Sequence, residues 1–180
     1  MFTQVRLKSN ITATIRIAQK SDTKALIQCI NDYISSPFIP VTKEEFQQKS
    51  LEEQEAWVEG LNTQANSLLL VAEVDGLIVG NIDLTAPNLQ QLQHTATIGM
   101  GIRKAWQRKG LGKVLLKQAI HWATHKSSLE MLWLQVFSTN KGGIHLYQQM
   151  GFETVGQQPK FVKVAPNHYV DNIIMQKQLW

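Results

Sequence analysis

The alternation of hydrophobic and polar residues divides the chain into short strands and helices. Residues 12–18 alternate with a period of two, which is typical of a strand with one buried face. Ser21-Asp22 then opens a helical pattern that runs to Ile34. Residues 43–61 carry one apolar stripe among many Glu and Gln residues, which predicts further helical segments.

Two apolar runs in the middle of the chain predict a hairpin. Residues 68–74 and 77–84 flank Asp75-Gly76, a dipeptide typical of a two-residue turn. Residues 95–102 resume the extended pattern but carry glycine at Gly99 and Gly101. Glycine weakens a strand, so we expect a bulge or the close approach of a ligand here.

The second half of the chain predicts alternating helices and strands. A helix that begins at Gly110 is followed by a strand over residues 131–137, a helix over about 140–150, and strand-like pieces around 152–156 and 169–176. A hairpin followed by such an alternation predicts an α/β fold with a mixed sheet and helices on both faces. A length of 180 residues fits a single domain over residues 1–180.

Composition and cysteine usage narrow the class of protein. With 43% hydrophobic and 18% charged residues, the chain is expected to fold without a partner. Cys29 is the single cysteine, so a disulfide framework is excluded. His121 and His125 are four residues apart but lack a third ligand, so we expect no metal site. No segment resembles a signal peptide or a membrane span, which predicts a cytoplasmic protein without a membrane partner.

The net charge of +4 comes largely from scattered residues, with one basic cluster between positions 103 and 113. This cluster lies beside two glycines at the predicted helix start, Gly110 and Gly112. The free backbone N–H groups of a helix start bind anions, and glycine lets a phosphate approach closely. The pattern predicts a site for a pyrophosphate, and no recognised nucleic-acid module is present, so we expect no nucleic acid partner.

Common nucleotide motifs do not account for this turn. The sequence GxxxxGK[ST] does not occur, and Gly110-Leu-Gly112 lacks the third glycine of a dinucleotide fingerprint. Residues 107–112 instead resemble the Gln/Arg-x-x-Gly-x-Gly/Ala signature of GNAT acetyltransferases. Residues 133–137 are similar to the family's fifth strand, and residues 140–152 to its Asn-x(6)-Tyr-x(3)-Gly-Phe segment. The chain thus resembles the GNAT superfamily from about Leu68 to Met175, including its ribosomal-protein and small-amine acetyltransferase branches.

The resemblance implies a GNAT fold, with a central, mostly antiparallel sheet that splays between the family's fourth and fifth strands. The pantetheine arm of acetyl-coenzyme A would lie in the splay along the backbone of Met100, Gly101 and Ile102. The helix start would hold the pyrophosphate through Gln107, Arg108, Lys109, Gly110, Leu111, Gly112 and Lys113. Asn140 would contact coenzyme A, and it also fits a plain helix N-cap; both roles are compatible.

Acetyl transfer needs a proton for the departing thiolate and a neutral amine. The resemblance assigns the proton donor to Tyr147, a phenol that is protonated at pH 7; packing in a helix is its other explanation. For the base, the sequence leaves open Glu73, Asp83, His94 and a water chain. Gln135 stands where relatives that acetylate protein N-termini often carry glutamate, and glutamine is no useful base.

The prediction is therefore an acetyl-coenzyme A-dependent N-acetyltransferase, with acetyl-CoA as co-substrate and a small-molecule or amino-acid-like amine as acceptor. Two alternatives stay open: a protein N-terminal acetyltransferase and a noncatalytic acyl-coenzyme A binding module. Gln135 disfavours the first, and Tyr147 argues against the second. The acceptor pocket is expected in the variable segments 35–61 and 159–168, and a homodimer is left open.

Overall fold

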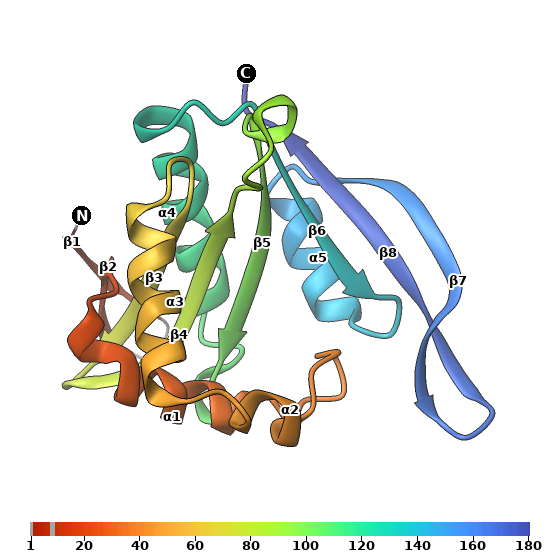
Figure 1. Cartoon of the computed structure of the whole chain (residues 1–180), viewed down its shortest axis with the longest axis horizontal. Coiled ribbons are helices and arrows are strands. Elements are labelled where there is room, and N and C mark those ends of the chain that lie inside the picture. The colour runs from red at the N-terminus through yellow and green to blue at the C-terminus, as the bar shows by residue number, and fades with distance from the viewer. Residues whose placement is uncertain (1, 8–9) are drawn as a thin grey trace.

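The computed structural model describes residues 2–7 and 10–180, and its strands form one eight-stranded sheet in the order β1-β2-β3-β4-β5-β6-β8-β7 (Figure 1). All neighbouring strands are antiparallel except β5 and β6. The strands are β1 (Phe2–Arg6), β2 (Thr12–Ile17), β3 (Leu68–Val74), β4 (Leu77–Thr85), β5 (Thr95–Ile102), β6 (Met131–Phe137), β7 (Glu153–Ala165) and β8 (His168–Gln178). The predicted mixed sheet is confirmed.

Helices cover the sheet on both faces (Figure 1). One face packs against the fourth and fifth α-helices, and the other packs against the first and third. The helices are α1 (Thr23–Tyr33), α2 (Lys43–Gln47), α3 (Leu51–Thr63), α4 (Leu111–Lys126) and α5 (Lys141–Gln149), with short 3₁₀ turns η2 (Lys20–Asp22), η3 (Gln90–Leu92) and η4 (Lys104–Trp106).

The burial of β3 explains why its sequence is an unbroken apolar run. Leu68 and Leu70 point into the core under α4, whereas Leu69 and Val71 point into the core under α1 and α3. A strand that is buried on both faces needs apolar residues at every position. The turn at Asp75-Gly76 has positive φ angles of 49° and 78°, as a two-residue hairpin turn of the predicted kind requires.

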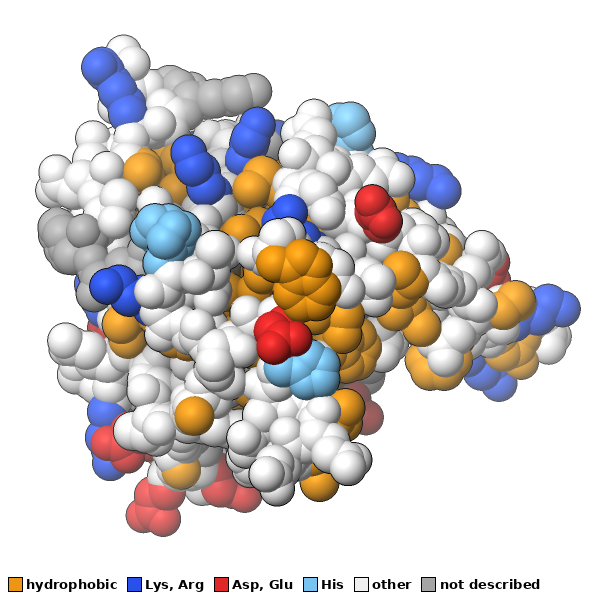
Figure 2. Space-filling model, turned by 90° about the horizontal axis from the view of Figure 1, so that it is seen from above, with side chains coloured by type: hydrophobic (Ala, Val, Ile, Leu, Met, Phe, Trp, Pro, Cys, Tyr) orange, Lys and Arg blue, Asp and Glu red, His pale blue; other side chains and the backbone are white. Residues whose placement is uncertain are grey.

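The two ends of the chain contain more strand than the sequence pattern predicts. β1 was not predicted, because it is short and has no clear alternation of apolar residues. β7 and β8 extend beyond the predicted pieces into a long hairpin whose outer half is mostly exposed. Figure 2 shows this hairpin projecting from the body of the molecule.

The sheet opens between β5 and β6, as the family resemblance predicts. The two parallel strands pair only from Thr95 to Thr97 on β5 and from Met131 to Trp133 on β6. Beyond these residues β5 stays paired with β4, and β6 stays paired with β8, so a gap widens between them (Figure 1). The far end of the gap lies next to the start of α4.

Of the two explanations expected for the glycines of β5, the bulge is wrong, and the close approach of a ligand stays a prediction. β4 and β5 pair in continuous register from Gly80 opposite Ile102 to Thr85 opposite Thr97. The two glycines of β5 are explained by neighbouring side chains instead. A Cβ at Gly99 would lie 2.5 Å from an oxygen of Asp83, and a Cβ at Gly101 would overlap the ring of Tyr33.

Candidate active site

The loop between β5 and α4 is held in a tight, partly left-handed conformation. Arg108 and Gly110 have positive φ angles of 60° and 89°, and Gly110 is the N-cap of α4. Gln107 ties the loop to the strand, because its side-chain amide donates to the carbonyl oxygen of Ile102 at 3.1 Å. Gly110 therefore meets a backbone requirement that few residues other than glycine satisfy.

The start of α4 is built to attract an anion. No side chain caps the helix at Gly110, and a Cβ at that position would meet no atom within 4 Å, so the space beside the first turn is open. The dipole of a 16-residue helix and its free N–H groups place partial positive charge there. The side chain of Lys109 adds a full charge, with its Nζ atom 4.7 Å from the centre of the Trp106 ring.

Gly112 is buried and serves the packing of the helix. A Cβ there would lie 3.1 Å from Leu146 of α5, 3.4 Å from Ile102 and 3.8 Å from Met100. The absent side chain thus lets α4 sit close to both β5 and α5, and it does not by itself open the predicted phosphate site. The same contacts bring two of the predicted pantetheine residues, Met100 and Ile102, against the helix start.

Asn140 is the N-cap of α5. Its Oδ1 atom accepts a hydrogen bond from the backbone N–H of Gly143 at 2.9 Å. This contact fulfils the capping role expected from the sequence. The predicted contact with coenzyme A stays a prediction.

Tyr147 lies on α5, on the side of the sheet that carries α4. Its ring packs edge-on against Phe152 with centroids 5.8 Å apart, and only 9% of the residue is exposed. Burial, and then the nearby Asp83 carboxylate, raise the pKa of Tyr147 to about 12. The phenol is therefore protonated at neutral pH, the form that can donate to a thiolate.

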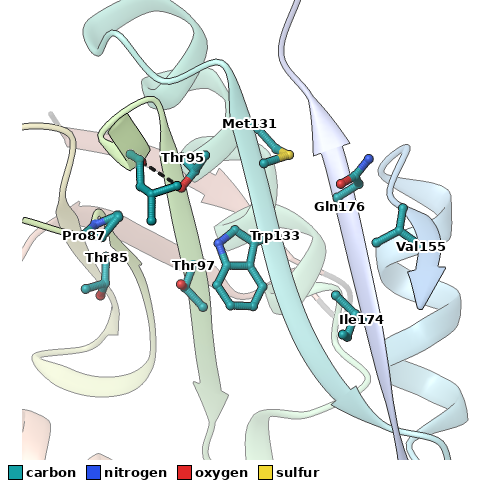
Figure 3. A pocket seen from close by; sticks show the side chains of 10 residues that line it. Thr85, Pro87, Thr95, Thr97, Met131, Trp133, Val155, Ile174 and Gln176 are labelled. Carbon is teal, nitrogen blue, oxygen red and sulfur yellow. Dashed lines mark hydrogen bonds between the residues drawn. The ribbon is translucent and has the colours of Figure 1, made fainter. Parts of the chain in front are cut away.

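A cavity of about 490 Å³ lies on the opposite face of the sheet, beside the point where β5 and β6 separate (Figure 3). In Figure 3, Trp133 stands between the threonines of β5 and the side chains of β8. Most of the lining is apolar, with a few hydroxyl and amide groups. The lining residues are Thr85, Pro87, Leu92, Thr95, Thr97, Met131, Trp133, Val155, Ile174 and Gln176.

This cavity was not predicted from the sequence, although the alternation of polar and apolar residues on β4 carried a signal. Ile82 and Leu84 of β4 point into the core, so Asn81, Asp83 and Thr85 share the other face. Alternation along β4 therefore places these polar residues on one face, where Asn81 accepts a hydrogen bond from Tyr33 and Thr85 lines the cavity. The cavity is built mainly by strands, and neither predicted segment, 35–61 or 159–168, supplies any of its lining residues.

Three other residues were considered for the site. Two of them, Glu73 and Gln135, form hydrogen bonds with neighbouring side chains, and His94 lies outside the open part of the splay. Glu73 accepts two hydrogen bonds from Arg16, at 2.8 and 3.0 Å. His94 precedes the first residue of β5, at the closed end of the splay. Gln135 accepts a hydrogen bond from Asn172 at 2.8 Å.

Two further features of the described residues bear on the class of protein. No helix within residues 2–7 and 10–180 is both long and apolar enough to cross a membrane. In the same part of the chain, no three His, Cys, Asp or Glu side chains are grouped in a way that could hold a metal ion. Cys29 is buried in the core formed by α1, α3 and the sheet, and burial raises the pKa of its thiol to about 11.

Comparison with known proteins agrees with this geometry. The model of the acetyltransferase (GNAT) family matches residues 27–152. The L-amino acid N-acetyltransferase AaaT of Escherichia coli (strain K12) is 26% identical over 121 residues, which are 67% of this chain and 74% of AaaT.

Solved structures share the fold over nearly the whole chain. A GNAT-family acetyltransferase from Streptococcus pneumoniae superposes with a TM-score of 0.87 at 27% identity, covering 93% of this chain and 99% of that one. The yncA protein of Salmonella typhimurium, whose structure contains its cofactor acetyl-CoA, has a TM-score of 0.81 at 24% identity, covering 93% and 94% of the two chains.

A sheet that splays at its parallel pair, with a glycine-capped helix start at the mouth of the splay, is the arrangement that the sequence resemblance implies for an acyl-coenzyme A-dependent transferase. The chain belongs to the GNAT acetyltransferase family, and it is an acetyl-CoA-dependent N-acetyltransferase.

Proposed function

We propose that this enzyme transfers the acetyl group of acetyl-CoA to the primary amine of a small, amino-acid-like acceptor with an apolar side chain. The observation that carries this proposal is the 490 Å³ cavity beside the splay. Its volume is within the range of small-molecule sites, about 300–1,000 Å³, and its lining is mostly apolar with a few polar groups. The similarity to AaaT, an L-amino acid N-acetyltransferase, supports the same class of acceptor.

In this proposal the two reactants bind on opposite faces of the sheet. The pyrophosphate would lie at the start of α4, and the pantetheine arm would follow the backbone of residues 100–102 into the splay. The acceptor would enter from the opposite face, with its side chain against Trp133 and its amine directed to the gap. Both reactants then meet where β5 and β6 separate.

The transfer forms a bond from the amine nitrogen to the acetyl carbon and breaks the bond from that carbon to sulfur. A bound ammonium group must first lose one proton, because its pKa is near 10. After the attack the nitrogen loses a second proton, and the departing thiolate gains one from Tyr147. Backbone N–H groups that line the splay can stabilise the negative oxygen that develops; loss of one such donor typically costs about 3 kcal/mol.

A panel of acceptors tests the proposal directly. We expect thiol release from acetyl-CoA to be fastest with free amino acids that carry apolar side chains, and slower with polyamines and short peptides. Preference for peptides would instead support a protein N-terminal acetyltransferase. Binding of acetyl-CoA in calorimetry, without turnover on any amine, would point to a noncatalytic module.

Trp133→Ala is expected to raise the KM for the amino acid about 10- to 100-fold. The substitution removes the largest apolar side chain of the cavity, and burial of such a group contributes about 1.5–3 kcal/mol. The affinity for acetyl-CoA should stay within about twofold, because Trp133 lies on the acceptor face. Steady-state kinetics with each substrate varied in turn separates the two effects, and an unchanged acceptor KM would remove Trp133 from the proposed site.

A further inference from the structure

Asp83 lies at the centre of the acceptor face, at the point where the sheet opens. It stands on β4 directly opposite Gly99 of β5, and its neighbours on the same face are Asn81 and Thr85. Thr85 lines the cavity and donates a hydrogen bond from its hydroxyl to an Asp83 oxygen at 3.1 Å. The carboxylate thus lies beside Thr85 on the same face of the strand, and Thr85 lines the cavity proposed for the acceptor.

Gly99 makes room for this carboxylate. A Cβ at position 99 would lie 2.5 Å from Oδ1 of Asp83, closer than any real side chain tolerates. The Asp83 oxygens therefore occupy the space that a side chain of β5 would fill. This position is next to the edge of β5 that lines the splay.

Burial and uncharged hydrogen-bonding groups set the pKa of Asp83. Burial raises its pKa to about 6, although the Thr85 hydroxyl and the amides of Asp83 and Gly99 favour the charged form. Two phenols, Tyr33 of α1 and Tyr147 of α5, interact with the charge of Asp83, which raises the pKa of both. No cation among the described residues contributes to the shift in its pKa.

We propose that Asp83 is the general base that accepts the proton of the acceptor amine. This inference rests on the proposed function, and it assigns the base within that same site. The carboxylate lies on the acceptor face, whereas Tyr147 lies on α5 on the other side of the sheet, near enough for the charge of Asp83 to raise the pKa of its phenol. A base and an acid on opposite sides of the reacting carbon match the two proton transfers of the reaction.

The protons balance over one cycle. Asp83 takes one proton from the bound ammonium group, the neutral amine attacks, and the carbon–sulfur bond breaks. The second proton of the nitrogen is lost to the surrounding water, and Tyr147, having protonated the thiolate, regains one proton from water. Asp83 then releases its proton to solvent, so the net reaction yields the amide, coenzyme A and one proton.

The other acids and bases are less well placed. Glu73 is held by Arg16 on the far side of β3, in an ion pair at 2.8 Å. His94 lies five residues before Gly99, which corresponds to about 17 Å along a strand. Asp83 alone among these groups stands next to both the cavity and the gap.

Asp83→Asn tests the inference, because it keeps the shape and removes the base. We expect kcat to fall about 100-fold or more, with acetyl-CoA affinity within twofold of the wild type. The wild-type kcat/KM should rise to a plateau above pH 6, where Asp83 is ionised. The variant should lose this plateau and rise tenfold per pH unit until the amine itself loses its proton.

Stability provides a second measurement on the same variant. The pKa of Asp83 is higher in the folded chain than in the unfolded one, so ionisation disfavours folding. The wild type therefore loses stability as the pH rises from about 4 to about 6. At pH 8 we expect Asp83→Asn to melt at the same or a higher temperature than the wild type. A lower melting temperature together with a normal pH profile would show a purely structural role and overturn the inference.

Two further variants keep the test decisive. Thr85→Val removes a hydroxyl that favours the charged form, so the acid limb of kcat/KM should move to higher pH. His94→Gln is the matched control and should leave both rate and pH profile unchanged. If the wild-type enzyme turns over amino acids and Asp83→Asn keeps the same rate, only the role of Asp83 as the base is refuted. A wild type without turnover refutes the proposed function instead.

Discussion

Tyr147→Phe is expected to lower kcat about 100-fold or more while the affinity for acetyl-CoA changes less than twofold. The substitution removes only the hydroxyl, so the edge-on contact with Phe152 at 5.8 Å is kept. The lost group is the proton donor for the thiolate, and acid catalysis of this kind typically contributes 10²- to 10⁴-fold. Single-turnover kinetics with saturating acetyl-CoA measures the effect on the chemical step.

The control for Tyr147 is Phe152→Leu, which disturbs the same aromatic contact and leaves the phenol in place. If packing were the main role of Tyr147, this control would lose as much activity as Tyr147→Phe. A fully active, well-folded Tyr147→Phe enzyme would show that the thiolate leaves without an acid from the protein. The pKa near 12 predicts that no decline in rate between pH 7 and 10 comes from ionisation of Tyr147.

The second large effect is expected at the start of α4. Gly110→Asp should weaken acetyl-CoA binding about 100-fold relative to Gly110→Asn. Both side chains tolerate the left-handed backbone of this position, where φ is 89°, better than most others. Both would also enter the open space beside the helix start, so the two variants differ mainly in one negative charge.

That charge would stand next to the proposed pyrophosphate. Two like charges about 4 Å apart repel by roughly 4 kcal/mol at an effective dielectric constant of about 20, and solvent reduces this value. A loss of about 3 kcal/mol corresponds to about 100-fold in the dissociation constant. Calorimetry at low and high salt measures both variants, and the difference should shrink at high salt. Equal affinities would place the phosphates elsewhere.

The strands and helices were predictable where burial leaves a strong pattern. β3 and β4 are apolar because the sheet is covered on both faces, and the turn between them needs residues that accept positive φ. β1 and the outer hairpin of β7 and β8 were missed or shortened, because strands that face solvent carry no such pattern. Local sequence therefore predicts the centre of the sheet better than its edges.

The site was only partly predictable, because it depends on which residues lie across from each other. The helix start at Gly110 is a local feature, and the sequence located it. Asp83 is one of several candidate bases in the sequence, and the position of this residue opposite Gly99 is known only from the register of the strands. The glycines of β5 suggested a bulge or the close approach of a ligand, whereas the structure shows no bulge and places the side chains of Asp83 and Tyr33 where Cβ atoms would lie.

The short pairing between β5 and β6 gives the sheet an edge in its interior. Past Thr97 and Trp133, the backbone groups that face the gap have no strand to bond with. Water must hydrate these amides in the free enzyme, and a cosubstrate arm with amide groups of its own can replace that water strand-fashion. Acetyl-CoA would thus act as a removable strand, and by mass action its binding would raise the stability of the folded enzyme.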